Sequence, residues 1–165
     1  MKTVLVFGTF DNLHPGHRWF LKKAAIYGNR LVAVVSRDVF VQNMKGCPPV
    51  QNEATRITEL ESSGLVDIAI LADKNIRTYG VIKKIRPDVI CLGHDQLSLL
   101  NDLESWLARS DVISPALYVL PPWKRRKFSS TKRNRVNDKA VDFLASIMLS
   151  VSIPSATTAF GRPVG

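Results

Sequence analysis

The stretch from Val4 to Leu21 reads VLVFGTFDNLHPGHRWFL, and it decides the fold of this chain. It begins with Val4 to Phe7, a short apolar and β-branched run that is typical of a buried strand. A glycine turn follows, and Pro15 then stands at the first position of an expected helix. Such an arrangement makes an anion site, because free backbone N–H groups and the positive end of the helix dipole both favour phosphate.

His14 and His17 are three residues apart in the first turn of that helix, so both rings can lie on one side of the opening. Two imidazoles beside free N–H groups can donate hydrogen bonds to a phosphorus centre as charge builds on its oxygens. Two other interpretations are a metal-binding pair and surface histidines at a helix end. No further histidine or cysteine cluster completes a metal site, and neither alternative explains the glycine turn.

The same stretch resembles the G-T-F-D-x-x-H-x-G-H signature of the cytidylyltransferase-like nucleotidyltransferases. Its fixed positions are filled by Gly8, Thr9, Phe10, Asp11, His14, Gly16 and His17. The resemblance implies a Rossmann-like fold and transfer of an NMP from an NTP to a phosphorylated acceptor, with release of pyrophosphate. It further implies that His14 and His17 are catalytic and that the other signature residues bind the nucleotide.

Strand and helix patterns alternate along the chain. After the first strand, we expect strands at Leu31–Val35, Val66–Leu71, Val89–Leu92 and Leu117–Leu120. We expect helices at Pro15–Tyr27, Asn52–Ser63, Ile76–Ile85 and Leu97–Arg109, with Gly28 and Gly64 closing the first two. This order predicts an α/β, Rossmann-like, doubly wound and mostly parallel five-stranded sheet. It is not a dinucleotide dehydrogenase pattern, because no G-x-G-x-x-G follows the first strand.

The segment Phe40–Pro49, FVQNMKGCPP, is predicted to be a mobile loop. Related nucleotidyltransferases have a lysine in this loop and an arginine early in the next helix, both pointing at the triphosphate. Lys45 and Arg56 match that pattern, so the resemblance implies a catalytic Lys45 and a nucleotide-binding Arg56. Simple solvent exposure is the alternative for Lys45.

The tetrad Gly93–Gln96, G-H-D-Q, directly follows the fourth expected strand, at an edge where ligands gather in open α/β sheets. Gly93 and Asp95 are therefore candidate nucleotide-binding residues. Asp95 can hold a ribose hydroxyl or the acceptor, or it can cap the next helix. The tetrad resembles the G-Y-D-Q of archaeal-type FAD synthases, with His94 in place of tyrosine. This favours ATP and FMN giving FAD, and the alternative is CTP with glycerol 3-phosphate or a related alcohol phosphate.

The most basic stretch, WKRRKFSSTKRNR, spans Trp123–Arg135. It resembles the second family signature, I-S-S-T-x-x-R, with Phe128 in place of isoleucine and Asn134 in place of the arginine. Either Arg133 or Arg135 is then a candidate for the missing arginine's role. The resemblance implies contacts to the β- and γ-phosphates from Ser129, Ser130 and Thr131.

Apolar residues recur at helical spacing after Thr131 and predict a docked C-terminal helix, which is also a candidate homodimer interface. We therefore expect a nucleotidyltransferase domain over residues 1–153. Residues 154–165 are small, polar and rich in proline and glycine, and we expect a disordered tail there.

The 165 residues include 45% hydrophobic residues, enough for a core, and carry a formal net charge of +9 that favours an anionic partner. Nucleotide and nucleic acid are both anionic partners of this kind. A non-enzymatic alternative is therefore a basic nucleic-acid-binding module, but that function leaves the His motif without a role.

Membrane spanning is not expected. Cys47 and Cys91 lack metal or redox spacing, which fits a cytoplasmic setting. No carboxylate cluster is evident, so we expect Mg²⁺ to be held mainly by substrate phosphates and water.

Overall fold

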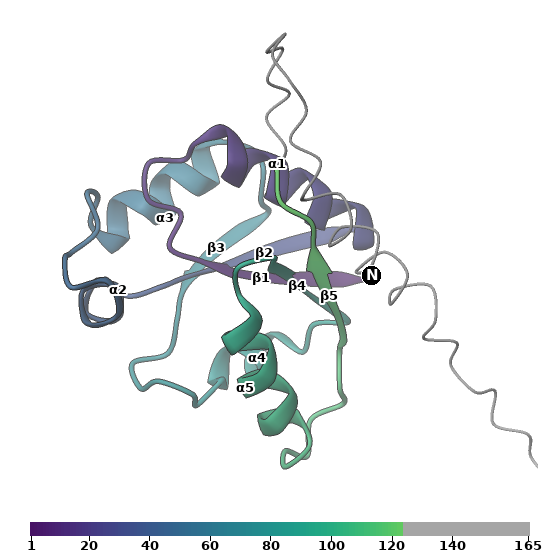
Figure 1. The fold of residues 1–165 in the computed structure, drawn as a ribbon. Coiled ribbons are helices and arrows are strands. Elements are labelled where there is room, and N and C mark those ends of the chain that lie inside the picture. Colours follow the sequence, from purple (N-terminus) through teal and green to yellow (C-terminus); the bar gives the residue numbers. More distant parts are fainter. Residues whose placement is uncertain (124–165) are drawn as a thin grey trace, which may run out of the picture. The chain divides into compact units, whose positions relative to one another are not determined.

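A five-stranded parallel sheet forms the centre of the computed structural model, which describes residues 1–123 (Figure 1). Its strands are β1 (Thr3–Gly8), β2 (Arg30–Val35), β3 (Ile68–Leu71), β4 (Val89–Gly93) and β5 (Ala116–Leu120). They lie in the order β3-β2-β1-β4-β5, and every pairing is parallel. The chain builds outward from β1 first to one side and then to the other. The crevice that ligands use in such sheets therefore opens at the carboxyl ends of β1 and β4.

Helices cover both faces of the sheet, as a doubly wound fold requires. They are α1 (Pro15–Ala24), α2 (Asp38–Lys45), α3 (Glu53–Ser62), α4 (Gly80–Ile85) and α5 (Leu97–Leu107). Figure 1 shows α1 and α3 on one face and α4 and α5 on the other. The predicted fold class is confirmed.

The strands divide their side chains between two cores. Val4 and Val6 point to the core under α1 and α3, where they pack with Leu21. Leu5 points to the other core, with Ile82 of α4. All five side chains are fully buried. A strand buried on both faces needs apolar residues at consecutive positions, which explains the unbroken apolar run of β1.

The prediction of a loop at Phe40–Pro49 is wrong for its first half, because residues 40–45 belong to α2, which extends to Lys45. Val41 of α2 is buried, and Gly46 ends the helix in the left-handed conformation (φ 76°). The glycine and two prolines that follow Lys45 suggested a loop, but they only mark where the helix stops. Lys45 is thereby placed at a helix end.

Two other helices are shorter than predicted. The expected helix Ile76–Ile85 begins only at Gly80, after Arg77 and Tyr79 adopt left-handed backbone (φ 63° and 48°). The first helix ends at Ala24 and continues as a short 3₁₀ turn, Ala25–Tyr27. Gly28 is extended rather than left-handed, and it is needed for close approach, since a Cβ there would lie 2.5 Å from the Lys2 carbonyl oxygen.

The remaining helix and strand boundaries agree with the sequence to within about two residues, with Asn52 capping α3 and Gly64 left-handed as expected (φ 65°). Within residues 1–123, the structure contains no helix that is long and apolar enough to cross a membrane. The predicted second signature at Ser129–Thr131, the C-terminal helix and the tail lie outside the described residues.

Candidate functional site

The turn between β1 and α1 lies at the crevice and has an unusual backbone. Phe10 and Asn12 both adopt positive φ (54° and 46°), a conformation that costs non-glycine residues energy unless their surroundings impose it. The Phe10 ring folds back under Gly8 and is buried, and a Cβ on Gly8 would lie 2.7 Å from that ring. Glycine at position 8 is therefore required by the way the turn closes.

Asp11 holds this turn to the segment before α3. Its carboxylate accepts hydrogen bonds from the N–H groups of Val50 (2.8 Å) and Gln51 (2.9 Å). Burial raises the pKa of Asp11, but these N–H groups and the charges of Arg56 and Lys45 outweigh it, so the pKa lies below 3.8. Both carboxylate oxygens have partners in the protein, and Asp11 thus fixes the shape of the turn.

The rings of His14 and His17 stack with centroids 3.7 Å apart and planes at 23°. His14 is the N-cap of α1, and its Nδ1 accepts from the N–H groups of Gly16 (3.1 Å) and His17 (3.4 Å). An Nδ1 that accepts cannot carry the proton of a neutral imidazole. This hydrogen-bond pattern therefore assigns the proton of His14 to Nε2, which is left as a donor.

His17 lies deeper than His14, with the Phe10 ring edge-on to it at a centroid distance of 5.5 Å. Its Nδ1 is buried, and no residue of the described chain hydrogen-bonds to it. Burial, together with the positive charges of His14 and Lys45, lowers the pKa of His17 to about 4, against the opposing effect of Asp11 and Asp95. His17 is consequently a neutral imidazole at pH 7, which is compatible with its stacking on a second imidazole.

Lys45 is exposed at the carboxyl end of α2, and its charge acts on both Asp11 and His17. The structure therefore brings Lys45 to the same side of the crevice as the His pair. A flexible ammonium at this place is suited to a phosphate oxygen as a mobile point charge.

The turn after β4 is organised by Gln96, which was not predicted as a site residue. Its side-chain carbonyl accepts from Gly93 N–H (2.8 Å), and its amide donates to the Phe7 carbonyl (3.0 Å). The side chain thus joins the carboxyl ends of β4 and β1. The sequence did contain a signal, since Gln96 is the last residue of the tetrad.

Asp95 is exposed beside Gly93, whose Cβ would lie 2.8 Å from an Asp95 carboxylate oxygen. It does not cap the next helix, because the N-cap of α5 is Gln96, and within the described part of the chain no side chain caps it. The capping alternative is therefore wrong. The influence of Asp95 on the pKa of His17 places its charge at the same crevice.

Arg56 does not have the environment of a phosphate ligand. Its side chain is fully buried and donates to the carbonyls of Gln51 (3.0 Å), Thr9 (2.5 Å) and Ser36 (2.8 Å), and to the Asp38 carboxylate (2.5 Å). In this conformation it has no surface to offer a nucleotide. Arg56 lies in the first turn of α3, early in the helix as expected, but its side chain turns into the protein.

At each of the N-termini of α2 and α3, a backbone N–H group donates to a carboxylate from the other helix. Asp38 accepts from the N–H of Glu53 (3.1 Å), and Glu53 accepts from the N–H of Asp38 (3.0 Å). These carboxylates already neutralise the positive ends of both helices. The N-terminus of α1, capped by the His14 ring and with no acidic residue in its first turn, is the one beside the His pair that suits an anion.

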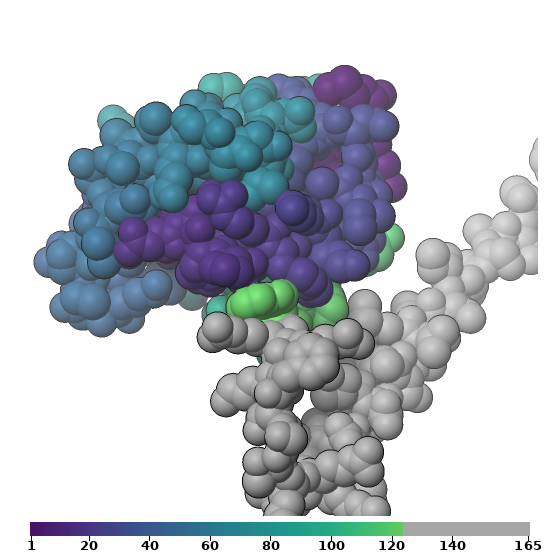
Figure 2. All heavy atoms as spheres, turned by 90° about the horizontal axis from the view of Figure 1, so that it is seen from above, coloured from purple at the N-terminus to yellow at the C-terminus, as the bar shows by residue number. Residues whose placement is uncertain are grey.

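Trp123 lies beside the same helix start. A Cβ on Gly16 would be 3.9 Å from its ring, and its exposed fraction is 40%. Figure 2 shows the light-green end of the described chain next to the purple N-terminal segment. A half-exposed aromatic ring therefore borders the signature turn and the start of α1.

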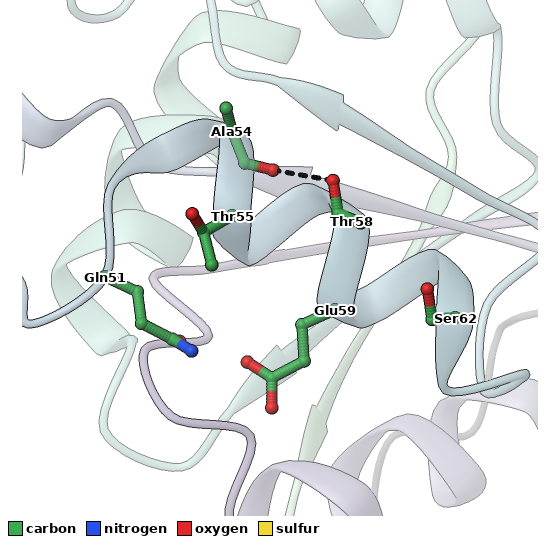
Figure 3. Close-up of a pocket in the computed structure, with 6 residues that line it drawn as sticks. All are labelled: Gln51, Ala54, Thr55, Thr58, Glu59 and Ser62. Atoms are coloured by element: carbon green, nitrogen blue, oxygen red, sulfur yellow. Dashed lines mark hydrogen bonds between the residues drawn. The ribbon is translucent and has the colours of Figure 1, made fainter.

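A groove of about 470 Å³ follows the outer side of α3 (Figure 3). Its lining is Gln51, Ala54, Thr55, Thr58, Glu59 and Ser62, with the Thr58 hydroxyl donating to the Ala54 carbonyl. The lining holds no histidine, lysine or arginine, so it lacks the cations that a triphosphate requires. The candidate site is the crevice around the His pair and not this groove.

Residues 5–136 match the family model described as Cytidylyltransferase-like. The FAD synthase of Methanococcoides burtonii is 38% identical over 104 residues, which cover 63% of this chain and 71% of that protein. The FAD synthase of Aciduliprofundum boonei is 44% identical over 96 residues, or 58% of this chain and 63% of that protein.

Among solved structures, the fold is similar to the lipopolysaccharide core biosynthesis protein of Thermoplasma volcanium. The TM-score is 0.61 at 30% identity, over 76% of this chain and 98% of that chain. A protein of unknown function from Archaeoglobus fulgidus shares the fold at 18% identity and a TM-score of 0.57, over 81% of this chain and 96% of that chain.

Proposed function

We propose, since this chain belongs to the cytidylyltransferase-like family and is a nucleotidyltransferase, that it transfers AMP from ATP to FMN and so makes FAD. One observation carries the chemistry: two stacked imidazoles, of which that of His17 is neutral, stand at the open N-terminus of α1, beside a lysine. The FAD synthases at 38% and 44% identity support the choice of substrates.

In the proposed reaction, a phosphate oxygen of FMN attacks the α-phosphorus of ATP. A new P–O bond forms, the bond between the α-phosphorus and its bridging oxygen breaks, and pyrophosphate leaves with that electron pair. The attacking phosphate is already ionised, so the enzyme needs no general base. Catalysis then consists of positioning the two phosphates and stabilising the charge that develops between them.

The residues of the crevice divide these tasks. Nε2–H of His14 and the neutral ring of His17 donate to the α-phosphate and its bridging oxygen, while Lys45 stabilises the departing pyrophosphate. Backbone groups of the signature turn, at Gly8, Thr9, Phe10 and Gly16, approach the nucleotide. Asp95 holds a hydroxyl of the ribose or of the acceptor. The contacts proposed for Ser129, Ser130 and Thr131 lie outside the described residues.

A divalent ion would accompany the nucleotide. Among residues 1–123, no three histidine, cysteine, aspartate or glutamate side chains gather into a metal site. Mg²⁺ held mainly by triphosphate oxygens and water is compatible with such a crevice, because the ion then needs few protein ligands. When bound, the ion neutralises phosphate charge, and Lys45 would share that task.

Pyrophosphate release from a panel of substrate pairs tests the proposal. The protein would be incubated with Mg²⁺ and ATP or CTP, each with FMN or glycerol 3-phosphate. We expect pyrophosphate only with ATP and FMN, accompanied by FAD. Release only with CTP and glycerol 3-phosphate would overturn the choice of substrates. No release with any pair, together with RNA or DNA affinity that falls steeply with salt, would favour the nucleic-acid-binding alternative.

A further inference from the structure

Arg56 is the largest fully buried side chain of the described residues, and it carries a charge in the core. A buried charge is expensive unless it is paired and hydrogen-bonded. Arg56 meets this condition with one carboxylate and three backbone carbonyls. The four acceptors belong to three segments, which are the turn after β1, the junction of β2 with α2, and the residue before α3, so the guanidinium cross-links parts of the chain that are distant in sequence.

One of these bonds reaches the signature turn. Nη1 of Arg56 donates to the carbonyl of Thr9, directly before Phe10 with its positive φ. The ring of Phe10 in turn meets His17 edge-on. The hydrogen bond therefore restrains the backbone at the residue whose side chain supports His17.

Two other bonds reach α2. Nη2 of Arg56 donates to the carbonyl of Ser36, which follows β2, and to the carboxylate of Asp38, the first residue of α2. Lys45 is the last residue of the same eight-residue helix. The orientation of α2, and with it the place of Lys45, depends on this end of the helix.

From these contacts we propose that Arg56 is a positioning residue that sets the His pair and Lys45 relative to one another for transfer. The proposal rests on the proposed function for its activity readout, but the geometric claim is independent of which substrates react. A planar guanidinium can satisfy four acceptors at once, whereas an ammonium at the same place has three donors and no planar fork. Arg56→Lys keeps the charge and removes this geometry.

The test combines kinetics with NMR of the histidine rings, which is direct here because the chain has three histidines. For Arg56→Lys we expect kcat to fall about 10²-fold with a much smaller change in KM for ATP, since small displacements at a reacting centre have effects of that size. The ring resonances of His14 and His17 should move, while those of the exposed His94 should stay. Adding guanidinium ion to Arg56→Ala should restore part of kcat and return both resonances toward their wild-type positions.

Arg37→Lys is the matched control. Arg37 is only partly buried, it pairs with Glu53 at 3.6 Å, and its Nε donates to the carbonyl of Ala72, which follows β3, two strands away from β1. We expect this variant to leave the His14 and His17 resonances unchanged. If Arg56→Lys also leaves them and kcat unchanged, or if all three histidines move together, Arg56 has only a general structural role and the proposal is wrong. Wild-type protein without any transfer activity would contradict the proposed function alone, because the NMR comparison still decides the role of Arg56.

Discussion

Two turns meet at the carboxyl edge of the sheet, and they are built differently. The signature turn after β1 is tied by Asp11 and Arg56 to the segment before α3, and it holds two residues at positive φ. The tetrad turn after β4 is organised by Gln96, and it leaves His94 and Asp95 exposed. From this difference we propose a division of labour for the proposed reaction: a rigid turn for charge stabilisation at the phosphates, and an open turn that selects the acceptor.

The largest expected effect is at the rigid turn. His17→Ala should lower kcat on the order of 10²-fold or more, as loss of a transition-state donor does elsewhere, while the Kd for ATP changes less. Steady-state kinetics and calorimetry measure the two quantities. His17→Asn keeps an amide donor and serves as the control, with a smaller loss. Near-normal turnover of His17→Ala would show that His17, and with it the rigid turn, does not stabilise charge in the transition state.

Removing the Asp11 carboxylate, which links the signature turn to the segment before α3, should lower stability. Asp11→Ala leaves the N–H groups of Val50 and Gln51 without their partner, and we expect the free energy of unfolding to fall by about 2 kcal/mol, with kcat falling as well.

Asp88→Ala is the matched control for this change. Asp88 accepts from Thr3 N–H (2.6 Å) before β4, at the opposite edge of the sheet. The Asp88→Ala variant should have a lower free energy of unfolding and an unchanged kcat. Denaturant unfolding and kinetics on both variants decide the point, and equal kcat losses would show that the turn has no special role.

A smaller and more selective effect is expected at the open turn. Asp95→Asn removes an exposed charge beside the crevice, and we expect KM for the acceptor to rise about tenfold, as for loss of one hydrogen bond to a charged group. The KM for ATP should hardly change. A rise in KM for ATP instead would assign Asp95 to the nucleotide ribose and remove the division of labour.

The smallest effect is a pH dependence of stability. The pKa of His17 is lowered from 6.5 to about 4 in the folded protein, so between these values the unfolded chain binds more protons. Stability should be at its full value above pH 6.5 and fall as the pH drops to 4. After allowance for solvent screening of a partly exposed ring, we expect a loss on the order of 1 kcal/mol. Unfolding curves of wild type and His17→Gln measure it, and parallel curves over this range would mean that His17 titrates normally.

The sequence predicted the sheet and the proximity of His14 to His17 well because both depend on local patterns. The apolar run of β1, the glycine turn and Pro15 are contiguous, and each carries its own physical meaning. The helix α2 was missed because its single buried residue, Val41, gives a weak pattern beside a proline-rich end.

The direction of the Arg56 side chain could not be predicted from the sequence. It depends on four acceptors that only the fold brings together, among them Thr9 and Ser36. Gln96 shows the same limit, since its two partners lie at the ends of different strands. Residues that hold a site together through long-range contacts leave little trace in local spacing.

Isotope transfer from labelled ATP tests the central claim most directly. The protein would be incubated with Mg²⁺, FMN and ATP labelled at either the α- or the γ-phosphate, and the products would be separated. We predict that the α-label appears in FAD and the γ-label in pyrophosphate, and that His17→Ala suppresses both. Transfer of the γ-label to the acceptor, or an α-label that never leaves the nucleotide pool, would contradict nucleotidyl transfer to FMN.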